Sequence, residues 1–235
     1  MNDGSPLVPV YRSFVLVDVE SSSELLNPDL MKAREALYDV LGTAFARAGI
    51  GAEARTQEDR GDGVMVLLDP AVPKLGLATT FLDELVAALA AHNQANALSA
   101  WLRLRIALHA GDVDRDEHGW GGDALTSTFR LLDAPELKQR FKAVPRAQCA
   151  VIASDRFYDE VIRQHPSWTA AAGYGQVDVA RLRPRGAAWV RIPGYDRAPD
   201  APEAPGPSPE KTTPSAATNH FSGPVTTHRD FVINN

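Results

Sequence analysis

Short apolar runs alternate with helical stretches along the chain up to about Tyr195, and this alternation constrains the fold more than any other feature. The run Phe14-Val15-Leu16-Val17 is typical of a buried strand. Further strands are predicted over residues 51–56, 64–68, 102–108, 149–152, 176–179 and 188–192, and helices over 27–48, 75–93, 124–132 and 156–163. The resulting order, βαββαβ followed by αβαββ, predicts an α+β fold in which helices cover a ferredoxin-like sheet.

The composition changes after this part of the chain, so we expect one domain over residues 10–196. Residues 197–218 read RAPDAPEAPGPSPEKTTPSAAT, which has no apolar periodicity. Such a segment buries too little apolar surface to offset the entropy of ordering it, and this predicts a disordered linker. A short tail, residues 219–235, follows the linker.

Charge and cysteine content exclude several classes of protein. The 24 Lys and Arg against 30 Asp and Glu give a net charge of −6, which argues against a general nucleic-acid binder because such proteins need a basic face. The single cysteine, Cys149, excludes an internal disulfide framework, and its apolar strand predicts a buried, inert thiol. No apolar run approaches the about 20 residues of a membrane span, and residues 1–9 lack the features of a secretory signal. We therefore expect a cytoplasmic protein that does not enter a membrane.

Three segments place polar residues at strand ends or in turns. Asp18 and Glu20 end the first strand, where they are either ordinary exposed acids or ligands for a hard cation. Asp62 lies in an Asp-Gly turn that needs no function to explain it, but beside Asp18 it would form a carboxylate pair for a divalent cation. In the third segment, a glycine-rich loop joins a strand to a helix that carries Arg130. This loop has neither a P-loop nor a dinucleotide-binding fingerprint. His109 precedes the loop and is expected to be structural, because no second histidine lies at ligand spacing.

Taken together and in order, the three segments resemble the catalytic domain of class III nucleotide cyclases, the adenylate and guanylate cyclase family. FVLVDVESSS is similar to the family's first metal-binding strand, RGDGVMVLL to its Gly-Asp hairpin, and RIALHAGDV with GGDALTSTFRLL to its next strand, turn and helix. The resemblance covers about residues 12–194. It implies conversion of a nucleoside triphosphate to a 3′,5′-cyclic nucleotide and pyrophosphate, with two Mg²⁺ or Mn²⁺ ions at each site of a homodimer.

The resemblance assigns roles to residues of the catalytic machinery. Asp18 and Asp62 match the two metal-binding aspartates. Arg130 matches the arginine that stabilises the transition state, which in this family comes from the opposite subunit. Thr126 stands where the family has an asparagine that orients the ribose, and its hydroxyl can still donate one hydrogen bond.

Two further positions bear on the choice of base. Glu58 falls at the base-selecting position, where a glutamate in the family goes with guanine and a lysine with adenine. Gly119 falls near the second base-selecting position and offers no side chain there. The family also includes bacterial anti-phage cyclases that make cyclic pyrimidine nucleotides, so the base preference stays open.

Two functional hypotheses follow. In the first, the chain is an active nucleotide cyclase for bacterial signalling or anti-phage defence. In the second, it is a catalytically degenerate cyclase-homology module that acts in dimerisation or nucleotide sensing and recruits an effector protein through its tail. The tail interleaves Phe221, Val225 and Phe231 with small polar residues, and it resembles the amyloid-type signalling motifs of some bacteria. A frayed chain end is the simpler interpretation of the same residues.

Overall fold

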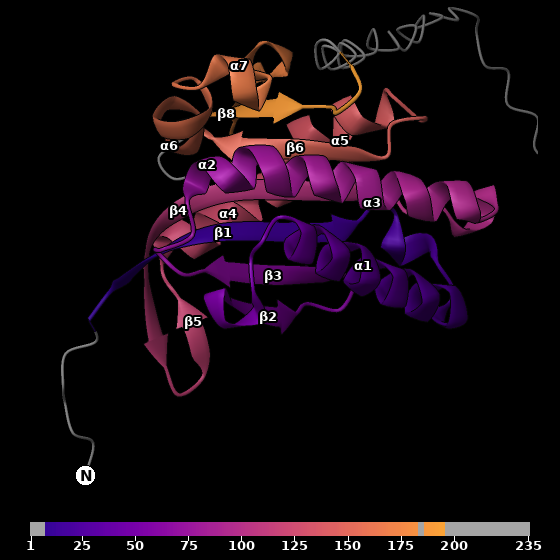
Figure 1. Cartoon of the computed structure of the whole chain (residues 1–235), viewed down its shortest axis with the longest axis horizontal. Helices are drawn as coiled ribbons and strands as arrows, with labels where there is room; N and C mark the ends of the chain where they lie inside the picture. The colour runs from indigo at the N-terminus through magenta and orange to yellow at the C-terminus, as the bar shows by residue number, and fades with distance from the viewer. Residues whose placement is uncertain (1–7, 183–185, 196–235) are drawn as a thin grey trace, which may run out of the picture. The chain divides into compact units, whose positions relative to one another are not determined.

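The computed structural model of the chain describes residues 8–182 and 186–195. These residues form a mixed sheet with strand order β2-β3-β1-β4-β6-β8-β7, and a short strand, β5, pairs with the far part of β4 (Figure 1). The strands are β1 (Val10–Val19), β2 (Arg55–Asp59), β3 (Gly63–Leu68), β4 (Leu104–Asp116), β5 (Gly119–Gly121), β6 (Cys149–Ser154), β7 (Gly175–Val179) and β8 (Gly186–Arg191). The helices are α1 (Asn27–Arg47), α2 (Lys74–Gly76), α3 (Leu82–Ala95), α4 (Asp123–Leu132), α5 (Pro135–Lys142), α6 (Asp155–Phe157) and α7 (Pro166–Thr169).

The first half of the domain confirms the predicted βαββαβ order. Its four strands lie in the order β2-β3-β1-β4, which is the arrangement of a ferredoxin-like sheet. β1 pairs antiparallel with both β3 and β4, and its residue Asp18 lies opposite Gly63 on one side and Arg105 on the other. The second half extends this sheet, because β6 pairs parallel with β4 and the β7–β8 hairpin adds to β6.

Side chains alternate between two faces of the sheet, and each face has its own apolar core. The first face carries Val15 and Val17 of β1 and is covered by α1 and α3, which lie side by side in Figure 1. The second face carries Phe14 and Leu16 of β1 and is covered by α4 and α5. By this alternation, Asp18 at the end of β1 belongs to the second face.

The helices of the first face follow from the sequence pattern. α1 begins with a proline in its first turn, where the missing N–H costs nothing, and it buries Leu37, Leu41 and Phe45 at helical spacing. Phe45 stacks on Phe81 with ring centroids 4.5 Å apart. This contact fixes α1 against the helix that precedes β4.

The helical segment from Lys74 to Ala95 is long and apolar enough, by length and composition alone, to cross a membrane. The search for a long run of consecutive apolar residues in the sequence did not identify this segment. Its residues Leu82, Leu85 and Leu89 are fully buried in the core of the first face. Packing inside the domain therefore explains why this helix is apolar.

Three of these elements, β5, α5 and the short helix α7, were not predicted from the sequence. β4 extends well beyond the expected strand and turns back through β5, so that part of the expected glycine-rich loop is a β-hairpin. α5 was also missed, although Pro135 at its start and Lys142 at its end are typical helix signals. The predicted linker (197–218) and tail (219–235) lie outside the described residues.

Candidate active site

Two strand connections bring Asp18 and Asp62 together. Asp18 is near the end of β1, and Asp62 lies in the tight turn between β2 and β3. The amide N–H of Val19 donates a hydrogen bond to the carbonyl oxygen of Asp62 at 3.1 Å, which ties the turn to β1. Gly63 permits this approach, because a Cβ atom there would lie only 2.5 Å from the carbonyl oxygen of Val17.

The two aspartates line one cavity of about 230 Å³. Its other walls come from Arg60 in the β2–β3 turn and from Phe129 and Asp133 at the end of α4. The cavity is therefore formed by the edge of the second face and by the helix that covers it. Asp18 and Asp62 stand on the strand side of the cavity, and Phe129 and Asp133 stand on the helix side.

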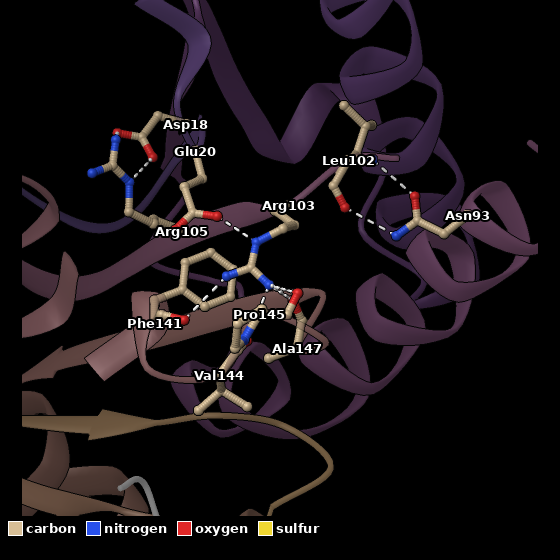
Figure 2. Close-up of polar contacts among 10 residues, drawn as sticks. All are labelled: Asp18, Glu20, Asn93, Leu102, Arg103, Arg105, Phe141, Val144, Pro145 and Ala147. Atoms are coloured by element: carbon tan, nitrogen blue, oxygen red, sulfur yellow. Dashed lines mark hydrogen bonds and ion pairs between the residues drawn. The ribbon is translucent and has the colours of Figure 1, made fainter. Parts of the chain in front are cut away.

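Asp18 is held by an arginine on the neighbouring strand (Figure 2). The Nε and Nη2 atoms of Arg105 each donate a hydrogen bond of 2.8 Å to one of the two carboxylate oxygens of Asp18. Burial nevertheless raises the pKa of Asp18 to about 6, because the loss of hydration and the nearby charge of Asp62 outweigh the lowering by Arg105. The Asp62 carboxylate accepts a hydrogen bond from the hydroxyl of Ser22, in the loop after β1.

The chemistry of this pair fits a divalent cation of the Mg²⁺ type. Such ions prefer carboxylate oxygens and are commonly held by one or two carboxylates together with phosphate groups of a substrate. Within the described ranges there is no cluster of three or more His, Cys, Asp or Glu side chains that could hold a metal by themselves. Asp18 and Asp62 would therefore supply only part of the ligands of the cation, and a phosphate-bearing ligand would strengthen its binding.

The two expected base-selecting positions also come together. Glu58 lies on β2 and Gly119 on β5, and a Cβ atom placed on Gly119 would be 3.9 Å from Oε1 of Glu58. Glu58 pairs with Arg60, whose Nη2 lies 2.9 Å from its Oε2. Arg60 also lines the cavity of the two aspartates, so this side chain connects the two groups of residues.

The helix α4 carries the remaining two predicted residues. α4 lies close to β4 because Gly111 has no side chain, since a Cβ there would be 2.6 Å from the Cβ of Ala124. The hydroxyl of Thr126 donates to the carbonyl oxygen of Gly122 at 3.0 Å, within its own helix. Arg130 has a buried Nη1 atom that finds no hydrogen-bond partner in the part of the chain the structure describes. It does not line the cavity with Asp18 and Asp62.

No protein-family model matches the sequence, and no curated protein matches it. Solved structures match over most of its length. The adenylate/guanylate cyclase/hydrolase from Silicibacter pomeroyi is 18% identical, with a TM-score of 0.54 over 80% of this chain and 99% of that chain. The guanylyl cyclase Cya2 is 16% identical, with a TM-score of 0.53 over 83% of this chain and 99% of that chain. The chain has the class III nucleotide cyclase fold.

A third match with this fold is a non-canonical dimeric guanylyl cyclase domain of the RhoGC fusion protein from the aquatic fungus Blastocladiella emersonii. It is 14% identical, with a TM-score of 0.50 over 80% of this chain and 98% of that chain. At these identities the likeness establishes the architecture of the cyclase-fold domain. The roles of single residues have to be argued from the geometry of this chain.

Sequence reasoning missed three residues of the cyclase-fold site. Arg105 binds Asp18, Arg60 binds Glu58, and Ser22 binds Asp62. A signal for Arg105 was available, because the expected strand over residues 102–108 is an apolar run interrupted by arginine at positions 103 and 105. The contact of Arg60 depends on the geometry of a turn, and no spacing in the sequence indicates it.

Two other candidates lie away from the cavity. Nδ1 of His109 lies 2.7 Å from the hydroxyl oxygen of Ser154, and burial lowers the pKa of His109 to about 4. Its ring is therefore neutral at pH 7. Cys149 is a buried free thiol, and burial raises its pKa to about 12. A thiol in that environment is not a nucleophile.

Proposed function

We propose that the protein is a nucleotide cyclase that converts a nucleoside triphosphate to a 3′,5′-cyclic nucleotide and pyrophosphate. One observation carries the proposal: on a nucleotide cyclase fold, Asp18 and Asp62 line the same cavity. Glu58 and Gly119, from two other strands, meet next to Arg60 at the edge of this cavity. A phosphate-binding end and a base-binding end would thus be joined in one site.

The reaction needs charge to be stabilised around the phosphates. The ribose 3′-oxygen forms a bond to the α-phosphorus, its proton is released to water, and the bond to the β-phosphate oxygen breaks so that pyrophosphate leaves. Bound Mg²⁺ or Mn²⁺, two per site, would neutralise the triphosphate and make the 3′-hydroxyl more acidic. Asp18 and Asp62 would hold these ions. At pH 7 Asp18 is mostly ionised, because its pKa of about 6 lies below that pH.

Arg130 would stabilise the negative charge that develops on the phosphoryl oxygens. Its buried Nη1 has no partner within the described residues, and the side chain lies outside the cavity of the two aspartates. A second copy of the chain could supply Arg130 to that cavity. We therefore propose a homodimer with its active sites at the interface, an arrangement in which a monomer is inactive.

The degenerate-module hypothesis is favoured by a specific observation. The hydroxyl of Thr126 donates to the carbonyl oxygen of Gly122 in its own helix, so in this structure its proton is directed away from a ribose. Gly119 likewise offers no side chain to a base. In that case the domain would bind a nucleotide, or dimerise, without turnover.

A turnover assay separates the two functions. Purified protein with Mn²⁺ or Mg²⁺ and each of ATP, GTP, CTP and UTP is expected to give a cyclic product by mass spectrometry, and Asp62→Asn is expected to lose it. Lys142→Gln, a charge change at the end of α5, is the control and is expected to keep it. No product with any of the four nucleotides, from a confirmed dimer, would favour the degenerate module.

Mixing two inactive variants tests the shared site. Asp62→Asn and Arg130→Ala mixed in equal amounts should form heterodimers with one intact site, and about a quarter of the activity should return. Each variant alone should stay inactive. If activity stays absent after subunit exchange has been demonstrated, Arg130 acts within its own subunit or has no role.

The proposal extends to the cellular role. The cyclic nucleotide would serve bacterial signalling or anti-phage defence in the cytoplasm, and the tail would recruit an effector protein. Deleting residues 219–235 is expected to leave turnover unchanged and to abolish co-purification of that effector from the native host. A deletion that lowers turnover would show that the tail belongs to the enzyme rather than to recruitment.

A further inference from the structure

Two ion pairs connect the ends of β1 and β4 on the second face, and they differ in how their arginines are held (Figure 2). Arg105 pairs with Asp18, and two residues away along each chain segment Arg103 pairs with Glu20. Both pairs are largely shielded from water, with exposed fractions of 12% for Arg105, 17% for Asp18, 18% for Arg103 and 20% for Glu20. The two ion pairs have the same chemistry and similar burial, so the difference in the contacts of their arginines is informative.

Arg103 is fixed from several directions. Besides Glu20 it donates hydrogen bonds to the carbonyl oxygens of Phe141, Val144, Pro145 and Ala147. Its guanidinium carbon also lies 3.9 Å from the centre of the Phe141 ring. Removing Glu20 would leave these contacts in place, so Arg103 is a structural connection between β4 and the segment after α5.

Arg105 has a single anchor. Among the described residues, its side-chain hydrogen bonds all go to Asp18, with 2.8 Å from Nε to Oδ1 and 2.8 Å from Nη2 to Oδ2. A carboxylate offers about four lone-pair positions, and this two-pronged contact uses one on each oxygen. A cation that binds Asp18 must therefore share these oxygens with Arg105 or displace it.

The charges around the cavity indicate what the contact between Arg105 and Asp18 does. Asp18 and Asp62 line the same cavity, and two nearby carboxylates repel each other when no cation is bound. Ser22 gives Asp62 a neutral hydrogen-bond donor. Among the described residues, Arg105 is the positively charged group in direct contact with Asp18.

We propose that Arg105 is the resident counter-ion of the metal site: it holds Asp18 in place when the site has no divalent cation, and it competes with the cation for the Asp18 carboxylate. Arg105 is thus a positioning residue that weakens cation binding by the free protein. This inference rests on the proposed function, because it takes Asp18 and Asp62 to be the metal ligands. A nucleotide that brings its own phosphate oxygens would help the cation to overcome the competition.

Binding of Mn²⁺ alone tests the proposal, measured by the electron paramagnetic resonance signal of free Mn²⁺. Arg105→Met removes the charge and keeps the length of the stem, and it is expected to bind Mn²⁺ about tenfold more tightly than the wild-type chain. Arg105→Lys keeps the charge and loses the two-pronged contact, so a smaller increase is expected. Arg103→Met, in the neighbouring ion pair, is the matched control and is expected to leave the affinity for Mn²⁺ unchanged.

Thermal unfolding gives a second readout. Without Mn²⁺, Arg105→Met should melt below the wild type, because two carboxylates then face each other uncompensated. Added Mn²⁺ should raise the melting temperature of this variant more than that of the wild type. If Arg105→Met does not fold even with Mn²⁺, the affinity of Arg105→Lys for Mn²⁺ tests the proposal instead, and tighter binding than in the wild type is the expected result.

The outcomes separate this inference from the proposed function. Mn²⁺ binding that Asp62→Asn abolishes, with equal or weaker binding in Arg105→Met, would overturn the role of Arg105 alone. Equal tightening in Arg103→Met would also overturn it, because the effect would then belong to the strand end in general. If neither the wild type nor the Arg105 variants bind Mn²⁺ in an Asp62-dependent way, the metal site itself fails, and the proposed function fails with it.

Discussion

The two faces of the sheet are built from the same strands but follow different rules. On the first face, β1, β3, β4 and β6 present mostly apolar side chains to a core that includes α1 and α3. On the second face, the apolar core under α4 and α5 gives way at one edge to Asp18 and Glu20 with their arginine partners. Buried positions that carry charge cost stability unless they are paired. The pairs Asp18–Arg105 and Glu20–Arg103 both lie at this edge, and Asp18 of the first pair lines the candidate cavity.

The comparison also separates two kinds of arginine. Arg103 has several carbonyl partners and stabilises the fold, whereas within the described ranges the side-chain hydrogen bonds of Arg105 go to one carboxylate that lines the cavity. Proximity in sequence and an identical residue type therefore do not imply the same role. The role of each arginine follows instead from the residues that its side chain contacts.

The largest effect is expected on the first face. Phe45 is fully buried and stacks on Phe81, so Phe45→Ala should lower the free energy of unfolding by about 3–5 kcal/mol. The affinity of the folded protein for Mn²⁺ should not change, because Phe45 lies on the face away from Asp18. Urea denaturation gives the first quantity and Mn²⁺ titration below the unfolding range gives the second. A large change in affinity would show that the two faces are coupled.

A pH effect is expected on the second face. Burial and, to a smaller degree, the charge of Arg156 lower the pKa of His109 from 6.5 to about 4, while Asp123 and Glu160 act in the opposite direction. The neutral ring is favoured in the folded state, so this residue costs no stability above pH 6.5. As the pH falls from about 6.5 to 4, unfolding is increasingly favoured because only the unfolded chain takes up the proton, by about 3 kcal/mol in total.

The measurement is the difference between wild-type and His109→Gln unfolding free energies across this pH range. Asp18 acts in the opposite sense, because its raised pKa makes the folded protein gain stability as it is protonated. The difference between the two proteins removes this contribution. A difference that does not vary between pH 7 and pH 4 would contradict the assignment of a neutral, shielded imidazole.

The smallest effect concerns the base. Glu58→Gln keeps the size of the side chain and removes the charge that pairs with Arg60, so we expect the ratios of kcat/KM among ATP, GTP, CTP and UTP to change by about tenfold. Stability should change little, since the pair is partly exposed and such pairs contribute at most about 1 kcal/mol. Glu53→Gln, at an exposed carboxylate just before β2, is the control. Equal scaling of all four rates would mean that Glu58 does not face the base.

Much of the fold could be predicted because its signals are local. The apolar run before Asp18, the proline at the start of α1 and the Asp-Gly turn before β3 each specify a short piece of structure through nearby atoms. α5 was missed although its local signals, Pro135 and Lys142, are present, and β5 was missed because it has no such signal. A three-residue strand has too few residues to show a period, and its pairing with β4 is a contact that the glycines of the loop do not announce.

The sequence by itself determined the order of the elements, the acidic strand end at Asp18 and the turn that holds Asp62, because these depend on residues within a few positions of one another. Only the tertiary structure decided that Arg105 binds Asp18, that Glu58 lies next to Gly119, and that Arg130 lies outside the cavity. These relations join residues tens of positions apart. They depend on strand register and on how closely α4 packs against β4, and both are set by the packing of the whole sheet.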